Sequence, residues 1–136
     1  MPLPYPDDLA SVVLRTDFND DAAWDALRET IDTAQDGVAT YVDDPRFADV
    51  GIQVLVDEDA AAEDDDKITY VFLADAATMA DPTHPLLAVD LYDEPGRTFR
   101  VPAEWYPEIS ANLSIANMDF ADFADSTDTT GTFRGW

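Results

Sequence analysis

The sequence predicts a single α+β domain, a single layer pair in which a mixed four- to five-stranded sheet has its helices mainly on one face. Short apolar segments rich in β-branched and aromatic residues predict the strands, and longer segments with apolar residues at helical spacing predict the helices. The length of 136 residues and the hydrophobic share of 46% suit one core. Neither a repeat nor a linker is visible, so residues 1–136 are assigned to one domain.

The N-terminal part of the chain predicts a strand, a helix and an edge strand. Apolar residues alternate over 11–18, as in a strand that begins the sheet. Asn19 or Asp20 then suits the N-cap of a helix that ends near Ala34. Its apolar side is formed by Trp24, Leu27, Ile31 and Ala34. Residues 38–42 predict a short edge strand.

The middle of the chain combines an ambiguous segment, an acidic run and a buried strand. Residues 50–56 are apolar and β-branched but contain Gly51 and Gln53, so a strand and the start of a helix both remain open. Seven acidic residues crowd into 57–66, which predicts an acidic mobile loop. The continuous apolar run over 68–74 predicts a strand near the centre of the sheet, covered on both faces.

A β-hairpin is predicted from residues 86–101. Leu86–Tyr92 and Arg97–Val101 flank Asp93-Glu94-Pro95-Gly96, whose proline and glycine suit a tight turn. This loop places Asp90 opposite Phe99 and Tyr92 opposite Arg97, so Asp90 and Arg97 lie diagonally on one face. We therefore expect them to form a cross-strand ion pair.

The C-terminal part predicts one short helix and a tail that packs onto the domain. Pro107 argues against a long helix directly after the hairpin. Asn117 suits the N-cap of a helix over 118–125. Burying the aromatic side chains of Phe133 and Trp136 is worth roughly 1.5–3 kcal/mol each, so we expect both to pack back onto the core.

The charge is strongly one-sided, with 30 acidic residues against seven lysines and arginines and a formal net charge of -23. Such a charge repels nucleic acid and anionic membranes, and a basic partner or a cation is its natural complement. Simple solubility, a saline cytoplasm or the codon bias of a GC-rich genome would account for the same acid surplus without any partner. Direct nucleic-acid binding is the function that the charge excludes best.

The sequence offers no recognisable catalytic, metal or cofactor motif. There is no cysteine, so disulfides, thiolate nucleophiles and sulfur-ligated metals are excluded. His84 is the one histidine and lies between prolines without a recognisable nucleophile, so we interpret it as a surface loop residue. No signal peptide or transmembrane segment is recognisable, so we expect a cytoplasmic protein that does not bind membranes.

Two groups of residues are candidates for an interaction site. Charged and aromatic residues of the hairpin could form a site on a rigid element, and a hairpin stabilised by its own ion pair is the structural alternative. Two aromatic residues just after the hairpin are of the types enriched in interfaces, and a core lid is their alternative. The candidates are Asp90, Tyr92, Asp93, Arg97, Arg100, Trp105 and Tyr106.

Segments spread over nearly the whole chain have a family resemblance. They are Leu14-Arg15-Thr16-Asp17-Phe18, His84-Pro85-Leu86-Leu87, Asp90-Leu91-Tyr92-Asp93, Asn112-Leu113-Ser114-Ile115-Ala116-Asn117-Met118-Asp119-Phe120 and Phe133-Arg134-Gly135. On these residues the chain resembles an uncharacterised family of small acidic actinobacterial proteins, a domain of unknown function. The resemblance implies no activity, so no functional residue is carried over from it. Residues 50–66 depart from the family pattern.

The acid surplus and the lack of catalytic motifs lead to a functional expectation. We expect a non-enzymatic acidic interaction protein that binds a basic protein partner, of the immunity or inhibitor kind. A small-ligand-binding protein or enzyme that uses carboxylates of the 86–101 hairpin is the first alternative. A structural subunit of a larger assembly is the second, and the oligomeric state stays open.

Overall fold

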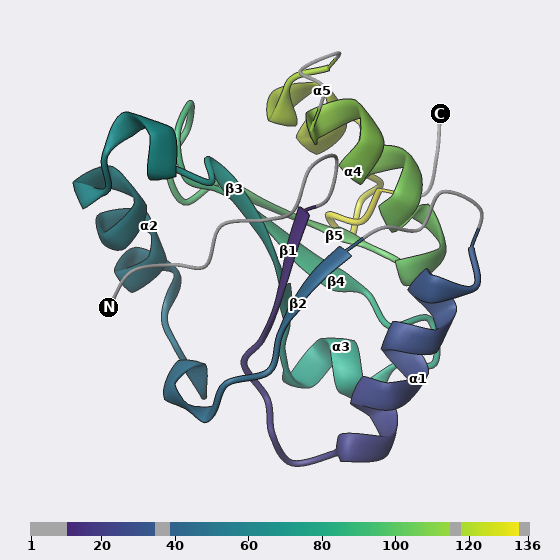
Figure 1. The fold of residues 1–136 in the computed structure, drawn as a ribbon. Helices are drawn as coiled ribbons and strands as arrows, with labels where there is room; N and C mark the ends of the chain where they lie inside the picture. The colour runs from purple at the N-terminus through teal and green to yellow at the C-terminus, as the bar shows by residue number, and fades with distance from the viewer. Residues whose placement is uncertain (1–10, 35–38, 115–117, 134–136) are drawn as a thin grey trace.

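A computed structural model describes residues 11–34, 39–114 and 118–133, and within them five strands form one mixed sheet (Figure 1). The strands are β1 (Ser11–Arg15), β2 (Ala39–Val42), β3 (Tyr70–Ala74), β4 (Leu86–Asp90) and β5 (Thr98–Val101). The helices are α1 (Asp21–Asp32), α2 (Ile52–Ala61), α3 (Ala76–Ala80), α4 (Tyr106–Ser114) and α5 (Phe120–Ala124), with 3-10 turns η1 (Pro45–Phe47), η2 (Asp64–Asp66) and η3 (Ala103–Trp105). The expected α+β class is confirmed.

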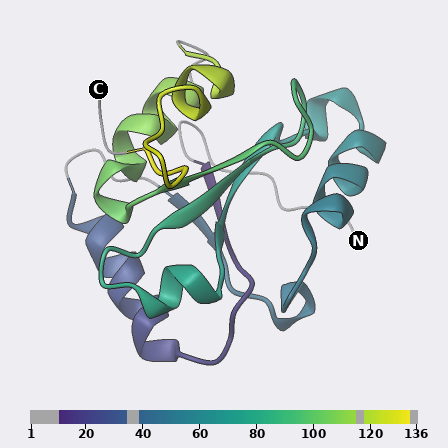
Figure 2. The ribbon, with the colours of Figure 1, turned by 180° about the vertical axis from the view of Figure 1, so that it is seen from behind.

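The sheet runs in the order β2-β1-β3-β4-β5, with β1 parallel to β2 and β3. The other pairs, β3 with β4 and β4 with β5, are antiparallel. The chain crosses from β1 to β2 in one lateral direction and from β2 to β3 in the other. Because parallel crossovers are right-handed, this reversal requires α1 and α2 to lie on opposite faces. Figure 1 and Figure 2 show that they do.

Each face of the sheet has its own hydrophobic cluster. The larger cluster joins the sheet to α1, α3, α4 and α5, so the helices lie mainly on one face, as expected. On the second face, Leu55 of α2 and Phe47 of η1 cover β1, β3 and β4. β3 contributes to both clusters, because Phe72 faces the first and Val71 the second. Its predicted position at the centre of the sheet is confirmed.

The first strand and helix follow the sequence pattern, with one difference. β1 ends at Arg15, three residues before the predicted end. Asp20 is the N-cap of α1, where its carboxylate accepts a hydrogen bond from the Ala23 N–H at 3.0 Å. The predicted apolar side of α1 is buried from Trp24 to Ile31. The short strand predicted next is β2, which forms one edge of the sheet.

The predicted acidic loop over 57–66 is wrong, because its first residues belong to α2 and its last form η2. The open choice at 50–56 is thereby settled in favour of a helix. Leu55 is fully buried, and Asp59, one turn later, is 2% exposed. The Asp59 carboxylate accepts hydrogen bonds from the N–H groups of Ile68 at 2.8 Å and Thr69 at 3.2 Å. One acidic residue of the run is therefore buried and serves as the acceptor for two backbone N–H groups just before β3.

The hairpin is confirmed, but its register differs from the predicted one by two residues. Phe99 lies opposite Ala88, and the Asp90 N–H donates to the Arg97 carbonyl at 2.9 Å. A shift of two residues keeps every side chain on its predicted face, so the hydrophobic pattern cannot exclude it. The longer connection that results is organised by the carboxylate of Asp90, described below.

The C-terminal part contains a helix that the sequence analysis missed. Pro107 stands in the first turn of α4, where a missing N–H leaves no hydrogen bond unmade. The last helix, α5, begins after the N-cap Asp119, and the predicted cap Asn117 lies outside the described residues. Phe133 is fully buried as expected, whereas Trp136 lies outside the described residues.

The edge of the sheet at β5 is covered by the chain's own tail. The Arg100 N–H donates to the Gly131 carbonyl at 2.9 Å, and the Phe133 N–H donates to the Arg100 carbonyl at 2.7 Å. Thr132 thereby forms a parallel bridge with Arg100. None of the described helices is both long and apolar enough to cross a membrane.

Candidate functional site

The segment after β5 forms one wall of a groove because of how its apolar residues are spaced. Tyr106 and Ile109 are fully buried against the sheet. Glu104, in η3, and Glu108, in the first turn of α4, do not belong to this buried face. Both are exposed. The segment thus leaves the carboxylates of both glutamates on the surface beside the groove.

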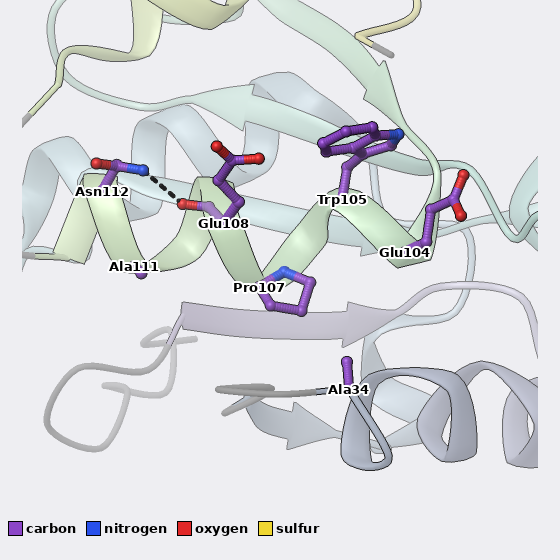
Figure 3. A pocket seen from close by; sticks show the side chains of 7 residues that line it. All are labelled: Ala34, Glu104, Trp105, Pro107, Glu108, Ala111 and Asn112. Atoms are coloured by element: carbon purple, nitrogen blue, oxygen red, sulfur yellow. Dashed lines mark hydrogen bonds between the residues drawn. The ribbon is translucent and has the colours of Figure 1, made fainter. Parts of the chain in front are cut away.

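The groove lies between this segment and the end of α1, and its volume is about 540 Å³. In Figure 3 the indole of Trp105 and the side chain of Glu108 extend on the same side of the helix, whereas the Pro107 ring lies on the opposite side, toward Ala34 and with a strand between the two in this view. The lining therefore has an aromatic and acidic part and an apolar part. Its lining residues are Ala34, Glu104, Trp105, Pro107, Glu108, Ala111 and Asn112.

Trp105 is half-buried and is held in place by the core. Its ring lies edge-on to that of Phe133, with the centroids 6.3 Å apart and an angle of 87° between the planes. Such an edge-to-face arrangement is favourable for aromatic pairs. Phe133 is in turn fixed by the tail that covers β5. The indole therefore has a defined position before any ligand binds.

The two glutamates of the groove lack a cation. Among the described residues, neither the Glu104 nor the Glu108 carboxylate has an ion-pair or hydrogen-bond partner. The five arginines of the described ranges are all paired with other carboxylates. These pairs are Arg15 with Asp21 and Asp43, Arg28 with Asp25, Arg46 with Asp44, Arg97 with Glu94 and Asp125, and Arg100 with Asp75.

The hairpin candidates do not form the expected ion pair. The carboxylate of Asp90 is 3% exposed and accepts hydrogen bonds from three backbone N–H groups, those of Tyr92, Asp93 and Glu94, at 2.9–3.2 Å. Arg97 instead pairs with Glu94 at 3.0 Å and with Asp125, the C-cap of α5. The predicted contact between Asp90 and Arg97 side chains is therefore wrong, because the turn's own N–H groups occupy the carboxylate.

Three of the hairpin candidates nevertheless line a common pocket. Asp90, Tyr92 and Asp93 lie around a space of about 210 Å³ near the start of α5. Tyr92 is 62% exposed and is one of the two large hydrophobic residues that stand out most from the described surface. Since the Asp90 carboxylate is occupied by the turn, Tyr92 and Asp93 are the two that remain available to a ligand.

Arg100 lies away from this pocket and pairs with Asp75, the N-cap of α3. Its two terminal nitrogens each donate to one carboxylate oxygen at 2.8 Å. Burial by itself raises the pKa of Asp75, but the Arg100 guanidinium and the Thr78 N–H outweigh it and hold the pKa below its ordinary value. This ion pair ties β5 to the end of β3.

The lowered pKa of Asp75 predicts an ion pair that acid removes. Because the folded-state pKa lies below the unfolded one, the stabilisation is complete above about pH 4 and is lost as the pH falls through the folded value. We expect Arg100→Gln to lower the free energy of unfolding by about 1–3 kcal/mol at pH 7, and by progressively less down to pH 3. Urea unfolding of both proteins at pH 7, 5, 4 and 3 measures the difference.

Arg46→Gln is the matched control, since its ion pair with Asp44 is about half exposed. We expect this variant to lose less than about 0.5 kcal/mol at any pH, because exposed ion pairs contribute little. A loss at Arg100 that stayed constant from pH 7 to pH 3 would contradict the assignment of the lowered pKa to this ion pair.

The surroundings of two further residues noted in the sequence, Tyr106 and His84, indicate structural roles. Tyr106 is fully buried, and burial raises the pKa of its hydroxyl to about 12, so it belongs to the core rather than to an interface. His84 is half-buried in its loop at φ 48°, with its Nδ1 3.3 Å from the Thr78 carbonyl oxygen. Within the described ranges, no three acidic or histidine side chains come together as a metal site would require.

Of the groove residues, only Trp105 was predicted from the sequence. Glu104 and Glu108 were not, because Pro107 between them argues against the helix α4 that forms this wall. A signal was available, since a proline is favoured at the first positions of a helix, where Pro107 stands in α4. Ala34 gave no signal, because it comes from a distant part of the chain.

Comparison with known proteins gives one family and no characterised relative. The family model described as "Domain of unknown function (DUF6924)" matches residues 10–136. The match covers all five strands and all five helices named above. Among curated proteins, none matches the chain.

Proposed function

Because the chain belongs to the DUF6924 family, whose domain has no assigned function, we propose its function from the groove itself: it is a non-enzymatic interaction protein that binds a basic protein partner. A lysine or arginine side chain of the partner enters the groove beside Trp105. The single observation that supports this most directly is the absence of a cation partner for Glu104 and Glu108 among the described residues.

The charge of the whole protein supports the same proposal. A net charge of -23 attracts a basic surface over long distances and accelerates the encounter. The groove then supplies what the diffuse charge cannot, which is a defined position for one side chain. Binding of this kind is fast and weakens strongly as salt is added.

The more specific form of the proposal is an immunity or inhibitor protein that acts in the cytoplasm. A basic cleft that normally binds phosphate groups is a natural target, because carboxylates can occupy the positions of the phosphates. A nuclease has such a cleft. The proposal assigns the groove to the contact and the remaining acidic surface to the attraction of the partner.

Affinity capture tests the proposal. The wild-type protein is immobilised and exposed to an extract of the native host at about 50 mM and at about 500 mM salt, a range over which electrostatic binding falls steeply. We expect the immobilised protein to retain a basic protein at the low salt concentration only. The double variant Glu104→Gln/Glu108→Gln should lose about 1–3 kcal/mol of binding, or roughly five- to hundredfold, since two charged contacts are removed.

The control for bulk charge is Asp65→Asn/Asp66→Asn, which removes the same two charges from exposed positions of η2. This variant should capture the same basic protein nearly as well as the wild type. Equal losses in both double variants would assign the binding to diffuse charge and reject the groove. Failure of the wild type to retain a basic protein at low salt would reject the proposed function.

The pocket beside Tyr92 and Asp93 supports a second candidate function, the binding of a small ligand or enzyme substrate at the hairpin. Its volume of about 210 Å³ suits a small molecule or a single side chain. The third possibility, a structural subunit, requires an apolar patch around Trp105 and Tyr106. Tyr106 is fully buried, so the described surface favours the other two candidates.

A further inference from the structure

We infer that the groove beside Trp105 selects arginine over lysine in the partner. This inference rests on the proposed function and specifies its ligand. It follows from three features of the groove: an aromatic plane held by the core, two carboxylates without a cation partner among the described residues, and small apolar residues in the lining. Each feature suits a planar guanidinium at the end of an aliphatic stem.

The fixed indole of Trp105 provides a surface for stacking. A guanidinium is flat and less strongly hydrated than an ammonium group, so it loses less when it leaves water to lie on an aromatic ring. Because the ring is held edge-on by Phe133, the stacked ligand need not order it first. Both properties favour arginine at this wall of the groove.

The presence of two carboxylates in one groove distinguishes the two basic side chains further. Glu104 of η3 and Glu108 of α4 both line it. A guanidinium has five N–H donors that point in different directions within one plane, so it can donate to two separate carboxylates. An ammonium group is a compact charge that approaches one carboxylate closely and the other less closely.

The remaining sides of the groove suit the aliphatic stem. The apolar part of the lining includes Ala34 and Ala111, which are small side chains that are not fully buried. The stem of a bound arginine can be covered there while its charged end lies near the carboxylates and the indole. The same cation neutralises the charge of Glu104 and Glu108, which a neutral ligand cannot do.

Three short peptides test the selectivity without the natural partner. They are N-acetylated, C-amidated Gly-Ser-Gly-X-Gly-Ser-Gly, where X is arginine, lysine or citrulline, the uncharged analogue of arginine. Binding to the full chain is followed by NMR through the indole N–H of Trp105, which is assigned by its loss in Trp105→Phe. We expect the arginine peptide to bind about threefold or more tightly than the lysine peptide, and citrulline to produce no saturable shift.

Variants locate the effect. Glu104→Gln and Glu108→Gln should each weaken the arginine peptide by about fivefold and reduce its preference over lysine, whereas Asp65→Asn should leave both unchanged. Amide signals outside the groove report whether each variant is folded. The Trp105→Phe variant keeps a ring against Phe133 but has no indole N–H, so peptide binding to it is followed through the backbone amide signals of the groove residues. Its loss of preference would reflect the smaller stacking surface rather than unfolding.

The outcomes separate this inference from the proposed function. Equal binding of the arginine and lysine peptides, weakened by Glu104→Gln, would overturn the arginine selectivity and leave a general basic site in place. Absence of a Trp105 shift with any charged peptide would overturn the inference, and the capture experiment would then decide the proposed function by itself. A citrulline peptide that bound as well as arginine would also overturn it, because the carboxylates would have no role.

Discussion

Asp90→Ala should lower the free energy of unfolding by about 3–5 kcal/mol, a loss comparable to that of truncating a buried aromatic residue of the core. The carboxylate is 3% exposed and accepts hydrogen bonds from three consecutive backbone N–H groups that follow it. Its removal leaves these donors without their acceptor in a partly buried turn. Urea unfolding followed by circular dichroism measures the loss.

Two further variants identify the cause of this loss. Asp90→Asn keeps one carbonyl oxygen as an acceptor but presents an amide to the Glu94 N–H, so we expect an intermediate loss of about 1–2 kcal/mol. Asp93→Ala removes a neighbouring exposed carboxylate and should cost less than about 0.5 kcal/mol. If Asp93→Ala destabilised the protein as much as Asp90→Ala, the role assigned to the Asp90 carboxylate would be refuted.

Asp59→Ala should also destabilise the protein strongly, by about 1.5–3 kcal/mol. Two N–H groups, those of Ile68 and Thr69, lose their shared acceptor, which costs about 2–4 kcal/mol. Alanine offsets about 0.5–1 kcal/mol of this cost, because it is the better helix former and because the substitution removes a negative charge near the C-terminal end of α2. The loss outweighs the gain.

The substitution of Asp59 also affects the backbone conformation of Thr69. Thr69 has φ 63°, which is unfavourable for a β-branched residue. Its N–H is held by Asp59, and its carbonyl accepts from the Leu91 N–H at 2.9 Å. Hydrogen exchange of these amides should therefore accelerate in Asp59→Ala but not in Asp65→Ala, whose carboxylate is exposed on η2. An unchanged exchange rate at Thr69 would refute this coupling.

The fold was predictable where a single hydrophobic pattern determined the outcome. The continuous apolar run of β3 has to be buried on both faces, and the spacing from Trp24 to Ile31 fits only a helix. The class and the central strand follow from these segments. The hairpin register did not follow, since a shift by two residues changes no side chain's face and is decided by the hydrogen bonds of Asp90.

The helix α2 and the groove were less predictable for a different reason. An acidic run indicates exposure on average, and the burial of Asp59 depends on N–H groups about ten residues further along the chain. The groove similarly needs α4, which Pro107 argued against, and a wall from the end of α1. Both features depend on partners that lie elsewhere in the sequence, so local patterns could not show them.

The tail bridge at β5 has a consequence for self-association. An open strand edge offers unpaired N–H and C=O groups to the edge of another molecule, which is a common route to aggregation. Here residues 131–133 occupy that edge, so detaching a few residues would create a reactive surface while the rest of the sheet stayed folded. Repulsion between molecules that each carry a net charge of -23 opposes their association through this edge, and acid or concentrated salt weakens the repulsion. The tail thus prevents self-association by covering the β5 edge, and the acidic surface opposes it by repelling other molecules before they make contact.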